Sequence, residues 1–97
     1  MCAISHTPEA VEDLKWLKRP AQKEVFEGVE AQLKHEPSVE TRNRKRLRPN
    51  DIAEWELRIG KFRVFYDVDE QEKVVKVEAV GYKDGSKLFI HGEEYQL

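Results

Sequence analysis

The sequence has one cysteine, Cys2, and no apolar run near the roughly 20 residues that a membrane helix needs. A lone cysteine cannot form an internal disulfide, and the first residues lack a basic segment followed by an apolar one, as a secretory signal would have. We therefore expect a cytoplasmic protein with no membrane partner. His6, His35 and His91 are scattered without metal-ligand spacing, and no glycine-rich phosphate loop occurs, so the sequence predicts neither a metal site nor a cofactor.

The 97 residues suit a single domain over residues 1–97, and their charge is unevenly distributed. The total is −2, but residues 1–41 carry −3, residues 42–63 carry +5 and residues 64–97 carry −4. A basic centre between acidic ends favours a localised anion-binding patch over a generally basic nucleic-acid binder.

Two amphipathic helices are predicted in the first third of the chain. Thr7-Pro8-Glu9 is a strong helix start, so the first helix should cover residues 8–18, with Ala10, Val11, Leu14 and Leu17 on its apolar face. Arg19-Pro20 interrupts it, and a second apolar stripe indicates a helix over residues 20–35. Helices joined so tightly should form an antiparallel hairpin with both apolar faces on the same side.

A β-hairpin around Gly60-Lys61 is the clearest feature of the second half. Glycine at the first of two turn positions suits a type II′ turn, which sets the register of the flanking strands, about residues 53–59 and 62–68. On one face the register gives three apolar pairs: Ile59 with Phe62, Leu57 with Val64, and Trp55 with Tyr66. On the other face Arg58 lies opposite Arg63.

The remaining strands predict an α+β fold. A third strand should cover residues 73–82 with Val75, Val77 and Ala79 on one face, and short strands are expected at residues 2–5, 45–47 and 88–90. We predict an N-terminal antiparallel helical hairpin packed on one face of a small, mostly antiparallel, twisted sheet. The opposite face should stay open, with Arg58 and Arg63 at its centre.

Like charges directly opposite each other are destabilising, so the Arg58–Arg63 pair has two explanations. The arginines either await an anion or each finds a carboxylate among Glu56, Glu78 and Asp67. A basic run nearby can hold rRNA or mRNA phosphates, remain a solvated loop, or dock an acidic partner. It consists of Arg42, Arg44, Lys45, Arg46 and Arg48.

Two motifs add a resemblance: L-R-I-G-K-F-R-V-F-Y-D-V at residues 57–68, and V-G-Y-K at residues 80–83. With the two preceding helices and the basic loop, the chain resembles the RelE/ParE superfamily of bacterial toxins from type II toxin–antitoxin systems. The resemblance implies an α/β sandwich and a cognate antitoxin that blocks the toxin's site. Its RelE branch cuts mRNA in the ribosomal A site without a metal, whereas its ParE branch poisons DNA gyrase.

The resemblance also implies roles for single residues. Arg63 matches the strand arginine that contacts the scissile phosphate, and Lys83 falls near a basic residue after the V-G motif. Phe89 stands where RelE has a catalytic tyrosine, and Glu54 and Glu56 stand where RelE has lysines. Our candidate catalytic residues are Arg63, Lys83, Arg58, Tyr82 and Glu56, with Tyr66 and Tyr95 as further tyrosines.

We therefore expect a ribosome-dependent mRNA endonuclease silenced by an antitoxin. The alternatives are a ParE-like toxin acting on gyrase without catalysis, and a non-toxic member of the fold that only binds a partner.

Overall fold

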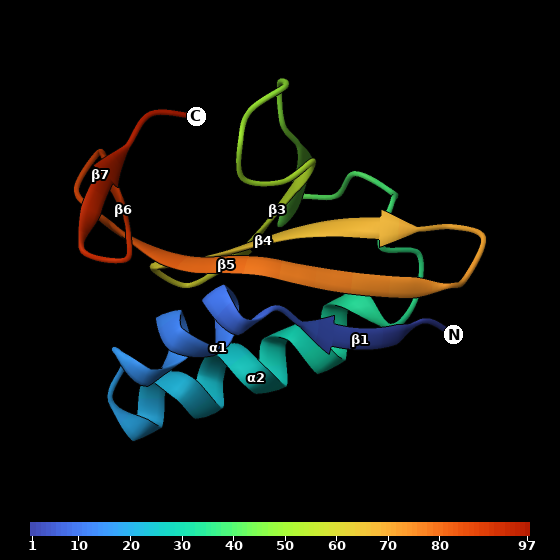
Figure 1. The fold of residues 1–97 in the computed structure, drawn as a ribbon, viewed down its shortest axis with the longest axis horizontal. Helices are drawn as coiled ribbons and strands as arrows, with labels where there is room; N and C mark the ends of the chain where they lie inside the picture. The colour runs from blue at the N-terminus through green and yellow to red at the C-terminus, as the bar shows by residue number, and fades with distance from the viewer.

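A computed structural model describes all 97 residues and shows two helices on one face of a seven-stranded sheet. The elements are β1 (Ala3–His6), α1 (Pro8–Lys15), α2 (Arg19–Leu33), β2 (Arg44–Arg46), β3 (Trp55–Ile59), β4 (Phe62–Asp69), β5 (Val74–Asp84), β6 (Lys87–Ile90) and β7 (Glu93–Tyr95). Strands β2 to β7 follow one another in an antiparallel order, and β1 pairs in parallel with β5. The α+β prediction is confirmed, and Figure 1 shows both helices below the sheet.

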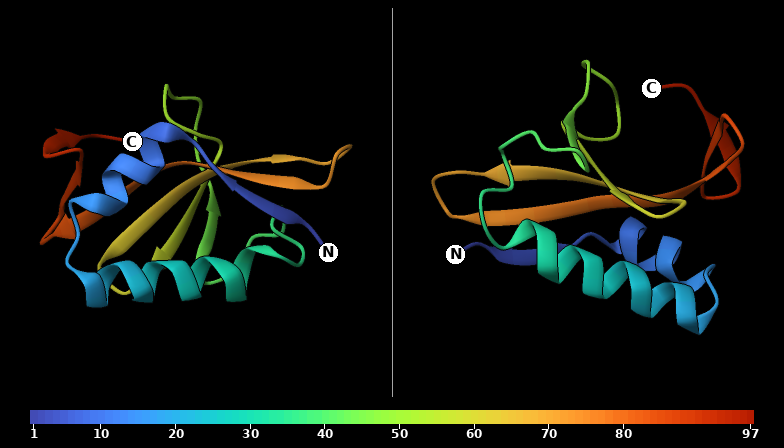
Figure 2. Two further views of the ribbon diagram at one scale, coloured as in Figure 1. Left: turned by 60° about the horizontal axis from the view of Figure 1, so that its bottom comes forward. Right: turned by 180° about the vertical axis from the view of Figure 1, so that it is seen from behind.

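Helix α1 begins where the sequence predicts, and three of the four predicted apolar residues pack in or against the main core: Ala10, Leu14 and Leu17. The Thr7 hydroxyl accepts the Ala10 N–H at 3.1 Å, which makes Thr7 the N-cap. Val11, expected in the core, is 41% exposed, whereas Asp13 is 4% exposed. The turn at residues 16–18 lets the two helices diverge across the sheet, as the left view of Figure 2 shows.

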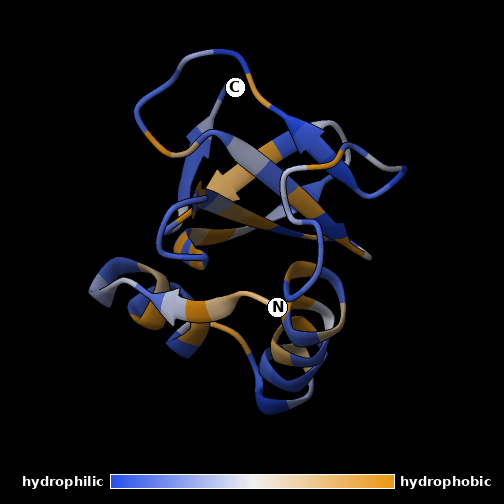
Figure 3. Cartoon of the chain, turned by 90° about the vertical axis from the view of Figure 1, so that its right-hand side faces the viewer, coloured by the Kyte–Doolittle hydropathy of each residue, from blue (hydrophilic) through white to orange (hydrophobic).

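The β3–β4 hairpin has the predicted register, including the Arg58–Arg63 pair. Gly60 has a φ of 56° and Lys61 stays in the ordinary negative region, as a type II′ turn requires. The apolar face of this hairpin packs against Val25, Val29 and Leu33 of α2 to form the main core. In Figure 3 hydrophobic residues are concentrated in the strands and helices, and the long loops are mostly hydrophilic.

A β-bulge in β5 changes which side chains reach that core. Phe65 pairs with Ala79 and Tyr66 pairs with Val77, so Glu78 is the extra residue. After the bulge the alternation is reversed: Val80 joins Val75 and Val77 in the main core, and Ala79 points to the opposite side. The prediction that Ala79 shares a face with the two valines is therefore wrong.

The opposite face of the sheet is partly covered, contrary to the prediction that it stays open. Leu88 and Ile90 of β6 pack there with Phe65, Ala79 and Ala53 in a second, smaller core. Tyr95 of β7 and the residues 47–52 loop pack around its edge. Figure 1 shows β6 and β7 curling up at one end of the sheet, with the loop before β3 rising opposite them.

Candidate functional site

A cleft of about 510 Å³ lies between β3 and the C-terminal hairpin. Its floor is the face of the sheet that carries Arg58 and Arg63, and its walls come from β2 and from β6–β7. The lining residues are Lys45, Leu47, Glu56, Arg58, Arg63, Lys83, Ser86, Lys87, Leu88, Glu94, Tyr95, Gln96 and Leu97. Four of the five predicted catalytic residues are therefore brought together.

Strand pairing explains why these side chains meet. Arg63 lies opposite Arg58 on β3 and opposite Gly81 on β5, and Lys83 lies two residues further along β5 on the same face. Gly81 leaves no side chain between Arg63 and β6. A Cβ atom there would stand 2.4 Å from the Phe89 carbonyl oxygen.

The Arg63 guanidinium is held in place by its own hairpin. It is 8% exposed, and Nη1 donates to the carbonyls of Gly60 at 2.8 Å and Phe62 at 2.9 Å. Its Nε is buried without a hydrogen-bond partner. Burial, followed by the charge of Arg58, lowers the pKa of Arg63, while Glu56 opposes this effect. Arg63 is thus a cation that two backbone carbonyls hold in a fixed orientation.

The cations of this cleft form no close ion pairs with carboxylates. None of Lys45, Arg58, Arg63, Lys83 and Lys87 forms an ion pair within 4.0 Å. Asp67 instead accepts the Glu54 N–H at 2.8 Å and interacts with Glu78. Asp67 and Glu78 therefore do not form ion pairs with the two arginines. Five cations face two acids, Glu56 and Glu94, and the cleft keeps a positive potential suited to an anion.

Comparisons with known proteins agree with this architecture. The family model for the ParE toxin of type II toxin-antitoxin system, parDE, matches residues 4–85. This chain belongs to that toxin family. The RelE/ParE resemblance seen in the sequence is thereby confirmed.

Two solved structures are similar to the toxin. One is the RelBE2 toxin–antitoxin complex from Mycobacterium tuberculosis, with a TM-score of 0.74 and 26% identity over 84% of this chain and 91% of that chain. The other is the archaeal RelE–RelB complex from Pyrococcus horikoshii OT3, with a TM-score of 0.65 and 21% identity over 81% of this chain and 91% of that chain, which shows the fold alone. A comparison with curated proteins gives no significant match.

The toxin's three tyrosines lie in different surroundings. Tyr82 is on the helix side of the sheet, where it stacks on Phe89 with ring centroids 5.5 Å apart, so the expectation that it reaches the arginine face is wrong. Tyr66 is fully buried, and its hydroxyl donates to the Pro37 carbonyl at 2.8 Å. Only Tyr95 lines the cleft.

The predicted RNA-binding run is divided by the alternation of β2. Arg44 points to the helix side, where Nη1 donates to the carbonyls of Gln32 at 2.8 Å and His35 at 3.2 Å at the end of α2. Arg46 pairs with Glu54 at 3.4 Å and lies 5.8 Å from the ring centroid of Trp55. Lys45 lines the cleft. Arg42 and Arg48, three residues before and after it in the sequence, are exposed.

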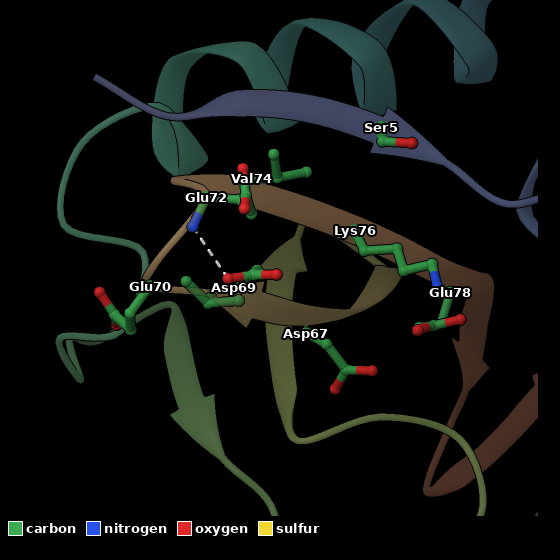
Figure 4. A pocket seen from close by; sticks show the side chains of 9 residues that line it. Ser5, Asp67, Asp69, Glu70, Glu72, Val74, Lys76 and Glu78 are labelled. Atoms are coloured by element: carbon green, nitrogen blue, oxygen red, sulfur yellow. Dashed lines mark hydrogen bonds between the residues drawn. The ribbon is translucent and has the colours of Figure 1, made fainter.

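An acidic pocket of about 700 Å³ lies at the other end of β4 (Figure 4). Asp67 and Asp69 come from β4, and Lys76 and Glu78 come from β5. Burial, followed by the hydrogen bond and charge of Asp67, raises the pKa of Glu78 to about 7. The toxin is therefore polarised along β4, with cations at its start and acids at its end. No three His, Cys, Asp or Glu side chains converge closely enough anywhere in the chain to hold a metal ion.

One polar cluster, formed by Asp13 and His91, has no counterpart among the residues predicted from the sequence. Asp13 on α1 accepts the Val80 N–H at 2.9 Å, and its other oxygen contacts Nδ1 of His91. The one sequence signal was the position of Asp13 three residues after Ala10, on the face that α1 buries. Its histidine partner lies 78 residues away, which no local pattern could indicate.

Neither helix of the toxin has the length and the apolar content that a membrane-spanning helix needs.

Proposed function

We propose that the toxin cleaves mRNA at the ribosome, with the basic cleft holding the scissile phosphate. The observation that carries this proposal is Arg63, a buried cation held by two carbonyls and paired with no carboxylate. A guanidinium in this state suits a phosphate group, because it stays charged and presents its donors in a fixed plane. We further propose that a cognate antitoxin silences the toxin in the cytoplasm, as the toxin–antitoxin complexes with a similar fold suggest.

Cleavage at the 2′-hydroxyl needs three contributions. The hydroxyl loses a proton as its oxygen attacks phosphorus, the pentacoordinate phosphate is stabilised, and the bond to the 5′-oxygen breaks as that oxygen gains a proton. Arg63 and Arg58 stabilise the phosphate. Glu56, on the same strand as Arg58, accepts the 2′-hydroxyl proton, and Tyr95 on the facing wall or Lys83 on the floor supplies a proton to the 5′-oxygen.

Tyr82 has no place in this scheme, because it lies on the far side of the sheet. The basic run contributes at the rim of the cleft. We assign RNA phosphate contacts to Lys45, Arg42 and Arg48, whose side chains form no ion pair within 4.0 Å, while Arg44 and Arg46 are engaged in intramolecular contacts. Phosphate contacts of this kind predict binding that weakens as salt rises.

Induced expression tests the proposal. Wild-type toxin should arrest growth and produce new 5′ ends in ribosome-bound message, detected by primer extension, and Arg63→Ala should abolish both. Because Arg63 also donates hydrogen bonds within its hairpin, the thermal midpoint of Arg63→Ala is measured as well, to detect unfolding. Arg58→Ala removes a second positive charge of the cleft at an exposed position. Arg19→Ala, on the helical side, is the matched control and should cleave as wild type does. Growth arrest with intact message would refute cleavage.

A ParE-like action on DNA gyrase is the second candidate, favoured by the family model that matches the chain. In this alternative the cleft binds an anionic partner without chemistry. Gyrase-linked DNA breaks and an SOS response, with intact message, would identify it. Harmless strong expression would instead point to a member that only binds a partner.

A further inference from the structure

The C-terminal hairpin that forms one wall of the cleft is attached at few points. β6 pairs with β5 through four residue pairs, and β7 pairs only with β6. Leu88 and Ile90 anchor the hairpin in the second core. Among side-chain hydrogen bonds and ion pairs, only the contact between His91 and Asp13 joins residues 86–97 to the rest of the chain.

We propose that Asp13 and His91 are positioning residues that lock the β6–β7 hairpin to helix α1 and so hold the residue 94–97 wall of the cleft in place. Neither residue lines the cleft, so the pair acts through the hairpin that joins them to it. We call the contact between Asp13 and His91 the lock. Its effect on RNA binding rests on the proposed function, whereas the contact itself does not.

Asp13 is an anchor fixed on both sides. Its side chain is 1% exposed, one carboxylate oxygen accepts the Val80 N–H just after the bulge of β5, and the other contacts His91. A carboxylate buried to this extent needs such partners, because desolvation without hydrogen bonds is costly. The acid thus connects three elements: α1, β5 and the turn between β6 and β7.

The orientation of His91 is set by its turn. Ile90 pairs with Glu93, which leaves a two-residue turn, and both His91 (φ 59°) and Gly92 (φ 76°) have positive φ, as a type I′ turn requires. The imidazole is 47% exposed, and its ring centroid is 6.4 Å from that of Trp16, which is itself 72% exposed.

The surroundings of His91 favour its protonated form. The hydrogen bond and then the charge of Asp13 raise its pKa, with smaller contributions from Glu12 and Glu93, while partial burial opposes them. Three further acids, Glu9, Asp51 and Glu78, share an adjoining pocket with His91. Lys15, on the same helix as Asp13, is paired with Glu12 at 3.2 Å.

The contact between Asp13 and His91 should stabilise the fold most at acidic pH. Because the pKa is raised on folding, the added stabilisation is complete below the ordinary histidine pKa of about 6.5 and is lost as pH rises through the raised value. Neutral imidazole can still donate one hydrogen bond to Asp13. The lock should therefore weaken at alkaline pH without disappearing.

Hydrogen exchange measures the lock directly in the full chain. At pH 6 we expect the amides of residues 93–95 to exchange about tenfold faster in His91→Gln than in wild type, because a charge-assisted hydrogen bond is lost. The ratio should shrink at pH 8.5, and the amides of β3 and β4 should not change. His35→Gln replaces another exposed histidine, whose side chain forms no hydrogen bond or ion pair, and should match wild type. Equal exchange of residues 93–95 in His91→Gln and wild type at pH 6 would overturn the proposal.

A fluorescence titration gives a second, spectroscopic readout. Protonated imidazole quenches a neighbouring indole, so the emission of Trp16 should follow the titration of His91, while Trp55 is buried and constant. Asp13→Asn should move the midpoint to lower pH, and His91→Gln should remove the transition. An unchanged midpoint in Asp13→Asn would contradict the pairing.

The effect on the cleft is tested with a fluorescein-labelled single-stranded oligoribonucleotide. At pH 6 we expect His91→Gln to bind it several-fold more weakly than wild type, with a smaller difference at pH 8.5. Equal binding at pH 6 would overturn the positioning role. If wild type does not bind the oligonucleotide, the proposed function fails, and the exchange experiment still decides the lock.

Discussion

Glu78→Gln should stabilise the toxin at alkaline pH and leave it unchanged at acidic pH. Glu78 is the extra residue of the β5 bulge, and its carboxyl group is partly buried beside that of Asp67. Burial and Asp67 raise its pKa from 4.5 to about 7, while Lys76 partly opposes them. A group whose pKa is raised on folding favours the folded state when protonated, and this contribution is lost as pH rises through about 7.

The size of this change in unfolding free energy can be worked out from the raised pKa of Glu78. A unit of pKa corresponds to about 1.4 kcal/mol, so the change from 4.5 to about 7 sets an upper limit of roughly 3 kcal/mol at pH 8.5. Asp67 shares the interaction and water reaches part of the carboxyl group, so we expect about half of that limit. A neutral glutamine keeps the shape and can still donate to Asp67. Its free energy of unfolding should therefore exceed that of wild type by about 1.5 kcal/mol at pH 8.5.

Urea unfolding at pH 4, below the ordinary pKa of 4.5, and at pH 8.5 measures this difference. Glu72→Gln is the matched control, because Glu72 lines the same pocket but is exposed, and it should change stability little at either pH. A gain for Glu78→Gln of equal size at both pH values, or none at pH 8.5, would refute the reasoning.

Two further predictions concern packing near the cleft and the core. Tyr66→Phe removes the hydroxyl that donates to the buried Pro37 carbonyl at 2.8 Å, so urea unfolding should show a loss of about 1–2 kcal/mol; no loss would mean that water replaces the bond. Gly81→Ala places a Cβ atom 2.4 Å from the Phe89 carbonyl oxygen and should separate β5 from β6. The thermal midpoint should fall by about 10 °C or more, and the exchange protection of β6 should be lost; an unchanged midpoint would contradict the close approach.

The local parts of this fold could be predicted from residue patterns. Thr7-Pro8 begins a helix, and Gly60-Lys61 forms the turn that sets the hairpin register, because capping and turn geometry depend on a few neighbouring residues. That register alone placed Arg58 and Arg63 on one face. The basic centre of the chain likewise predicted a localised patch of cations, and three of these cations, Lys45, Arg58 and Arg63, line the cleft.

Contacts between elements far apart in the sequence decided which other side chains reach the cleft. The bulge at Glu78 reverses the alternation of β5, so Tyr82 turns to the helices and Lys83 turns to the face that carries Arg63. The curling of β6–β7 converts an open face into a cleft and brings Tyr95 into it.

The amino-acid sequence by itself thus determined most of the elements and the hairpin register, and it made Arg63 the leading candidate for anion binding. The tertiary structure decided which partners surround Arg63, and it joined Asp13 to His91 across 78 residues. Local patterns report backbone preference and burial within one element, whereas a bulge or a polar contact between distant elements depends on how the whole sheet packs.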